Sequence, residues 1–229
     1  MQSFSGDLSP AGIYERVSRA FAENFAGGKE VGAGVSVWLN GGEVVCLQSG
    51  YADAAREQPW REDTLVLVWS ATKGLAAACV MHALQEARIS PLQPIARYWP
   101  EFAKNGKERI TAADVLSHRA GLAAIEGQKI SIFDHEAVVR ALEDQRPLWP
   151  PRSAHGYSPR TFGFLADEIV RRVAGTTLGT YWREVFAEPM GLDFWIGLPE
   201  ELHPRVAQML PPRMSPQDAN DPFLQAFND

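Results

Sequence analysis

Long apolar runs are missing from the 229-residue chain, so no segment reads as a membrane-spanning helix. The first residues also lack the basic start and apolar stretch of a secretory signal, and we therefore expect a cytoplasmic protein. An excess of basic charge is absent as well: the formal net charge is −6, which argues against nucleic acid or an anionic membrane as a partner. What is left is the composition of an ordinary globular protein, with 45% apolar and 22% charged residues.

Cysteine is scarce, and the spacing of cysteine and histidine does not match a metal site. We therefore expect no metal and no cofactor. Cys46 and Cys79 both lie among apolar neighbours, which predicts two buried free thiols rather than a disulfide. A G-x-S-x-G nucleophile elbow is also missing, which argues against an α/β-hydrolase.

One stretch carries the elements of a nucleophilic site. An apolar run ending at Trp69 is followed by Ser70, by Lys73 and then by an alanine-rich segment. If a helix begins near Ser70, the two side chains share one face, and the lysine amine can accept the serine proton. This role requires that burial or nearby positive charge lower the lysine pKa. An isolated S-x-x-K is more often an N-cap serine with a solvated lysine, but the apolar flanks favour a buried helix here.

The hydrophobic periodicity predicts one hairpin followed mostly by helices. The hairpin signal is Asn40-Gly41-Gly42, between strands at 32–39 and 44–49. Helices are expected at 11–25, 70–88, 133–144, 161–174 and 177–190. The segment 111–114 is expected to be an N-terminal cap, followed by a short helix as far as His118. We interpret residues 1–229 as a single domain with an N-terminal helix and hairpin (11–60), a mainly helical part (65–195) and a proline-rich tail (199–229). Two strands alone are marginally stable, and the tail offers no further strand.

Four ordered motifs carry a resemblance to a known family: Trp69–Gly74, Ala96–Phe102, Val115–Leu122 and Gly156–Gly163. Together they resemble the serine β-lactamase and penicillin-binding-protein superfamily, and within it the family VIII carboxylesterases related to class C β-lactamases. The resemblance implies an α+β fold, β-lactamase/transpeptidase-like, in which helices flank an antiparallel sheet beside a mainly helical subdomain. The family's third motif, a K-T-G-like or H-x-G-like triplet on a late strand, is missing, so the chain looks truncated at its C-terminal side and its sheet incomplete.

The resemblance also implies roles for individual residues. Ser70 would be the acylated nucleophile, Lys73 its proton acceptor or tuning group, and Tyr157 the second catalytic residue. A tyrosine near a lysine ammonium ionises more easily, so the pair can pass a proton from serine to leaving group. Without the motif, Tyr157 would read as a loop tyrosine with a hydrogen-bonded hydroxyl. Trp149 either lines the acyl site or simply packs.

Four further positions bear on this interpretation. His118 and Asp114 have the i, i+4 spacing that could join a Ser-His-Asp triad, but the resemblance makes His118 a buried structural histidine. Arg152 stands where the family usually has glycine. Pro159 replaces the asparagine of Y-x-N, which suits an esterase better than a β-lactamase.

The leading hypothesis is a serine hydrolase that cleaves carboxylic esters through a Ser70 acyl-enzyme. Alternatives are β-lactam hydrolysis or acyl transfer, and a catalytically silent truncated paralogue or binding module. The expected partner is a small-molecule ester. An unpaired sheet edge would also allow a homo-oligomer, and weak turnover is expected of the 229-residue form.

Overall fold

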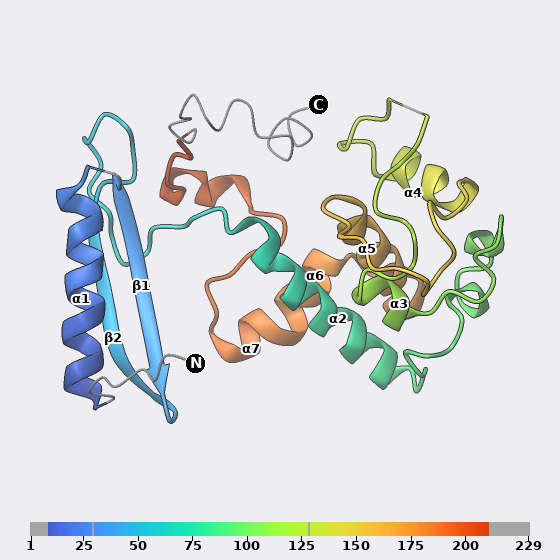
Figure 1. Ribbon diagram of the computed structural model, residues 1–229, viewed down its shortest axis with the longest axis horizontal. Helices are drawn as coiled ribbons and strands as arrows, with labels where there is room; N and C mark the ends of the chain where they lie inside the picture. The colour runs from blue at the N-terminus through green and yellow to red at the C-terminus, as the bar shows by residue number, and fades with distance from the viewer. Residues whose placement is uncertain (1–8, 29, 128, 211–229) are drawn as a thin grey trace. The chain divides into compact units, whose positions relative to one another are not determined.

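The computed structural model describes residues 9–28, 30–127 and 129–210, which fall into two compact units (Figure 1). The first unit contains residues 9–28, 30–67 and 200–210. The second unit is Val68–Pro199. Among the described residues, no helix combines the length and the apolar character needed to cross a membrane.

The first unit is a helix on a hairpin. Helix α1 (Pro10–Ala26) begins where the Ser9 side chain accepts the N–H of Gly12, and it lies along β2 in Figure 1. Strands β1 (Gly32–Leu39) and β2 (Gly42–Gly50) pair antiparallel, with a bulge after Val37. The turn between them has positive φ at both Asn40 and Gly41, the conformation for which Asn-Gly is favoured.

The sheet of the described residues has two strands, and its two faces differ. Val45 is buried, whereas Cys46 is exposed because successive side chains of a strand point to opposite faces. The prediction of a buried thiol is therefore wrong for Cys46 and correct for Cys79. On β1, the indole of Trp38 donates to the hydroxyl of Ser36 and stays 65% exposed. Self-association through the sheet edge stays a prediction.

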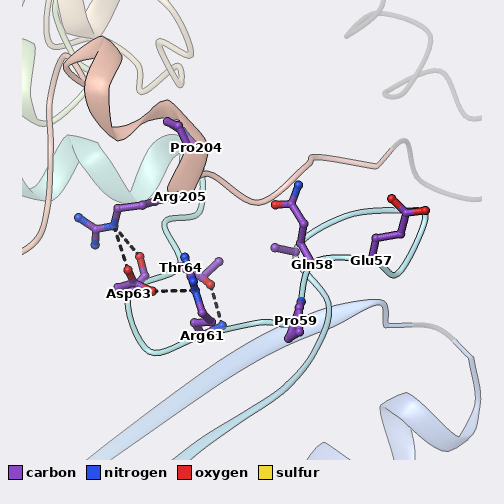
Figure 2. A pocket seen from close by; sticks show the side chains of 9 residues that line it. Glu57, Gln58, Pro59, Arg61, Asp63, Thr64, Pro204 and Arg205 are labelled. Atoms are coloured by element: carbon purple, nitrogen blue, oxygen red, sulfur yellow. Dashed lines mark hydrogen bonds and ion pairs between the residues drawn. The ribbon is translucent and has the colours of Figure 1, made fainter.

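The segment after Pro199 contributes pairing that the sequence did not reveal. A 3₁₀ helix (Glu200–Arg205) leads into a parallel bridge, in which the Leu65 N–H donates to the carbonyl of Arg205 and the Leu65 carbonyl accepts from Ala207. A polar pocket of about 310 Å³ lies beside this junction. Figure 2 shows the Asp63 carboxylate next to Arg205, whose Nε also donates to the Asp63 carbonyl at 2.9 Å. These contacts fasten the 61–64 loop to the 3₁₀ helix. The predicted tail beyond residue 210 lies outside the described residues.

The second unit is helical and is built around α2 (Thr72–Glu86), which packs on α5 (Thr161–Ala174) and α6 (Leu178–Trp182). The other α-helices among the described residues of this unit are α3 (Ala112–Leu116), α4 (His135–Asp144) and α7 (Glu188–Met190), and short 3₁₀ helices lie at Ile95–Arg97 and Pro100–Ala103. The helix expected over 177–190 is interrupted by a π-helical turn (Arg183–Ala187) shortly before Pro189, which cannot donate a helical hydrogen bond. The buried face of α2 consists of small and apolar side chains: Ala76, Cys79, Val80, Ala83 and Leu84.

A fully buried lysine fastens the loops of the second unit. The Lys107 side chain has no exposed surface, and its Nζ donates to the carbonyls of Lys104, Glu143 and Gln145. The amine also lies 5.6 Å from the centre of the Phe102 ring. Three carbonyls for three N–H donors satisfy the ammonium group completely, so one side chain holds two segments about 40 residues apart.

Lys107→Met should therefore destabilise the protein by about 2–4 kcal/mol, because it leaves buried carbonyls without donors. Lys104→Met is the matched control, since the Lys104 amine makes a partly exposed ion pair with Asp144 at 2.6 Å. Such a pair contributes about 0–1 kcal/mol. Urea unfolding of both variants measures the difference. Equal losses of stability would contradict the role given to Lys107.

Candidate active site

Ser70 lies in a single 3₁₀ turn, Trp69–Ala71, that runs directly into α2 at Thr72. Trp69 has φ +48°, a conformation that bulky residues rarely adopt and that often marks a functional turn. The structure differs here from the expected buried helix start at Ser70. Ser70 itself is exposed, and so are the apolar side chains before it, with Trp69 at 68%.

The three residues expected to form the site do meet. The Lys73 Nζ is 2.9 Å from the Ser70 Oγ, and the Tyr157 hydroxyl donates to the same Oγ at 2.6 Å. A second bond from the Lys73 Nζ, also 2.9 Å, goes to the carbonyl of Pro159. The amine stands 5.0 Å from the centre of the Tyr157 ring. The Ser70 hydroxyl thus lies between two groups that can exchange its proton.

The surroundings of Tyr157 favour its ionised form. The hydrogen bonds with Ser70 and then Lys73 lower the tyrosine pKa, the positive charge of Lys73 adds to this, and burial opposes it. When the pKa of a phenol is lowered, a larger fraction of it is ionised at neutral pH. Only this ionised form can accept a proton from Ser70. The arrangement can therefore deprotonate a serine and return the proton to a departing oxygen.

The alternative triad of Ser70, His118 and Asp114 does not match the contacts. Both Asp114 carboxylate oxygens accept hydrogen bonds from Arg152, at 2.8 and 2.7 Å. The Oδ2 oxygen also accepts the backbone N–H of Thr111. The Nδ1 of His118 faces the N–H of Ser158 instead, at 3.1 Å. This bond follows from no pattern in the sequence, because it joins segments 40 residues apart.

Arg152, the departure from glycine, has φ +71°, the left-handed conformation for which glycine is the usual residue. The guanidinium group makes a two-point ion pair with the largely buried Asp114 and also donates to the Arg109 carbonyl at 2.8 Å. Charge-assisted pairs of this geometry are among the stronger polar contacts and offset the backbone strain. Burial by itself would raise the Asp114 pKa, but the hydrogen bonds from Arg152 and Thr111 together outweigh it and lower the pKa.

Trp149 packs against the residue that precedes Tyr157. A Cβ added at Gly156 would overlap the Trp149 indole, so glycine is required for this close approach. The indole N–H points to the carbonyl of Ala154 at 3.3 Å. These contacts support the 154–157 loop, and a role for Trp149 in substrate binding stays a prediction.

A cleft of about 340 Å³ opens beside Lys73, and sequence reasoning missed it. Its walls come from α2, α5, α6 and the chain near Ile196, and most of the lining is apolar or small. The only available signal was glycine inside two helices, since glycine weakens a helix and often marks a close approach or an opening. The lining residues are Trp69, Thr72, Lys73, Ala76, His135, Pro159, Arg160, Phe162, Gly163, Phe164, Asp167, Leu178, Gly179 and Ile196.

Comparisons with known proteins show the family to which the chain belongs. The Beta-lactamase family model matches residues 17–229, and the chain belongs to that family. It is 36% identical over 201 residues to the esterase/beta-lactamase LipL of Mycobacterium tuberculosis, covering 86% of this chain and 46% of LipL. Esterase EstB of Burkholderia gladioli is 25% identical, with coverages of 81% and 52%. The chain thus spans about half the length of the curated relatives it matches.

Solved structures give the same result for the fold. A penicillin-binding-protein homologue from Caulobacter crescentus superposes with a TM-score of 0.84 at 43% identity, covering 89% of this chain and 56% of the other. A family VIII carboxylesterase superposes with a TM-score of 0.80 at 42% sequence identity, covering 88% of this chain and 56% of the carboxylesterase. A class C beta lactamase at 20% identity gives 0.75 and shows the fold alone. The expected β-lactamase/transpeptidase-like fold is confirmed.

If Lys73 and Tyr157 handle the same proton, their substitutions should not combine independently. Lys73→Ala and Tyr157→Phe should each slow the reaction of Ser70 with a fluorophosphonate by about 10²-fold or more, the size of a general acid–base contribution. The double variant should lose little beyond the slower single variant, as expected of residues that act as a unit. Fully multiplicative losses in the labelling rate, followed by intact mass, would show that the two residues act separately.

Proposed function

We propose that this chain carries the nucleophile and the proton relay of a serine hydrolase that cleaves carboxylic esters through an acyl-enzyme on Ser70. The observation that supports this most is the pair of short contacts to one oxygen, 2.9 Å from the Lys73 amine and 2.6 Å from the Tyr157 hydroxyl. Most exposed serines make no contact with two proton-exchanging groups.

The reaction follows from that geometry. The Ser70 proton moves to the Tyr157 phenolate, whose ionised form the charge of Lys73 stabilises. The Oγ then forms a bond to the ester carbonyl carbon, which gives a tetrahedral oxyanion. When this oxyanion collapses, the bond to the alkoxide breaks, and the alkoxide takes the proton from Tyr157 and leaves as the alcohol. In the second half, water gives its proton to the same phenolate and attacks the acyl-enzyme. The acid departs, and the proton returns to Ser70.

Two observations favour an ester over the alternatives. Pro159 offers only its carbonyl, which Lys73 occupies, and has no side-chain amide to bind the amide group beside a β-lactam ring. The relatives with similar sequence or structure include two esterases and a family VIII carboxylesterase. β-Lactam hydrolysis is the second candidate, because the name of LipL includes it. Acyl transfer uses the same acyl-enzyme with an alcohol in place of water.

The cleft beside Lys73 suits an apolar acyl chain. Phe162, Phe164 and Leu178 contribute apolar walls, and the cleft volume of about 340 Å³ falls in the range of small-molecule sites. Each methylene of a substrate chain buried there contributes roughly 0.8 kcal/mol. We therefore expect a preference for medium-chain acyl esters over acetate.

Ser70 should become covalently labelled by a fluorophosphonate, and protein carrying this chain should hydrolyse p-nitrophenyl esters faster than a chromogenic cephalosporin. Peptide mapping by mass spectrometry locates the adduct. Ser70→Ala removes the hydroxyl that the proposal acylates, and both labelling and turnover should disappear. Labelling that persists in Ser70→Ala would refute the assignment, and an unreactive Ser70 in folded protein would favour the silent paralogue.

Gly163→Leu should place an apolar side chain at the wall of the cleft, where a Cβ meets no atom within 4 Å. The ratio of kcat/KM for p-nitrophenyl octanoate to that for the acetate should fall about tenfold, a typical size for discrimination by a small apolar change. Gly163→Ala controls for the gain in helix propensity, and the exposed Ala174→Leu places the same side chain on α5 outside the cleft. An unchanged chain-length profile in Gly163→Leu would contradict this use of the cleft.

A further inference from the structure

One residue holds the backbone on both sides of Tyr157. The carbonyl of His118 accepts the N–H of Gly156 at 3.1 Å, and the imidazole Nδ1 of His118 accepts the N–H of Ser158, also at 3.1 Å. The imidazole ring lies 5.0 Å from the Tyr157 ring, centre to centre, and 5.2 Å from the Phe162 ring. The backbone N–H groups of the residues immediately before and after Tyr157 thus both donate hydrogen bonds to His118.

The backbone conformation of His118 allows it to accept both of these hydrogen bonds. Its φ is +58°, and it follows the short helix α3, so the chain turns sharply at this residue. Its carbonyl and its ring both reach the loop before α5. Histidine, with asparagine and aspartate, is found at positive φ more often than most residues, and only glycine adopts this backbone without a steric cost. The turn therefore tolerates His118, while the bond to Ser158 requires its imidazole acceptor.

The bond to Ser158 depends on the protonation state of the ring. Nδ1 can accept an N–H only while its lone pair is free, which requires the neutral imidazole with its proton on Nε2. When the ring takes up a second proton, Nδ1 becomes a donor that faces another donor, and the bond is lost. The Ser158 peptide is then released on one side of Tyr157.

We propose that His118 is the positioning residue of Tyr157, and that its neutral imidazole holds the phenol hydroxyl on Ser70 and releases it when the ring is protonated. This inference rests on the proposed role of Tyr157 as the proton-handling group. His118 donates nothing to the reacting atoms and acts through the backbone of the loop. A displacement of about 1 Å at Tyr157 is enough to slow the reaction by about 10²-fold.

The charged and titratable groups around the His118 ring influence the pH at which the ring is protonated. His155 and Tyr157 face it from the loop, Lys73 faces it from α2, and Phe162 on α5 is uncharged. Burial lowers the His118 pKa first, and the charges of His155 and Lys73 lower it further. The neutral ring is thus kept to a lower pH than in an ordinary histidine, and the reactivity of Ser70 should fall as the pH drops through this lowered value.

The test is the pH profile of Ser70 labelling by a fluorophosphonate in four proteins. The unsubstituted protein should lose reactivity through one ionisation below the ordinary histidine range, about pH 6.5. His118→Asn keeps an acceptor close to the position of Nδ1 and tolerates positive φ, so it should react within about threefold of the original at neutral pH and lose the acid decline. His118→Leu has no acceptor and should react at least tenfold more slowly at all pH values. His155→Gln removes the neighbouring histidine and should keep the decline.

Two results would overturn the proposal: an acid decline that persists unchanged in His118→Asn, or a His118→Leu protein that reacts at the original rate. If His118→Leu does not fold, the profile of His118→Asn still decides the matter. A separate readout does not need reactivity, since the Ser158 amide proton followed by NMR should shift with the His118 titration. If Ser70 stays unreactive while this amide shifts, the proposed function fails and the contact between His118 and the loop stands. A Ser158 amide that does not respond to the titration contradicts the inference itself.

Discussion

The amine of Lys73 joins two segments that lie 86 residues apart in the chain. One bond from its Nζ goes to the Ser70 hydroxyl one helical turn away, and the other goes to the carbonyl of Pro159 in the loop before α5. The second bond brings the Tyr157 loop against the start of α2, which places the phenol hydroxyl on the Ser70 Oγ. The Ser70 hydroxyl therefore has contacts with both segments, whereas an ordinary exposed serine contacts neither a lysine amine nor a phenol.

The packing beneath the site explains why such a cross-link can be maintained. Helix α2 presents alanine, cysteine and valine side chains to α5, so the two helices pack closely and the loop before α5 starts next to the N-terminal end of α2. Lys107 and the pair of Arg152 with Asp114 fasten the loops on either side of α3 through buried or half-buried charge. In each case a polar group whose burial would be costly has its hydrogen-bonding capacity filled by carbonyls or by a carboxylate.

The sequence predicted what local rules govern and missed what distant contacts govern. Asn40-Gly41 and the Thr111 cap appear in the structure as hairpin turn and capping box, because both depend on residues within a few positions. The short spacing of Ser70 and Lys73 was sufficient to bring their side chains together. Tyr157 could be assigned only from the resemblance, because no periodicity links positions 87 residues apart.

The errors have physical causes of the same kind. The helix was expected to begin at Ser70, but the positive φ of Trp69 turns the chain there and α2 begins at Thr72. Cys46 was expected to be buried because its neighbours in sequence are apolar, yet strand alternation leaves it on the exposed face.

Arg152 and Pro159 both depart from the family pattern, but their consequences for the site are opposite. The contacts that each residue makes show why. Arg152 replaces a glycine in a left-handed turn, and its side chain supplies an ion pair that compensates for the strain, so the turn is kept. Pro159 replaces an asparagine whose side chain could have bonded a substrate amide, and only its carbonyl is left, which binds Lys73. The first substitution therefore preserves the support of the site, whereas the second removes a polar group from it. A site with the proposed proton relay and without a side-chain amide at position 159 suits an acyl group with no amide to recognise, and this is the physical argument behind the proposal of a plain ester.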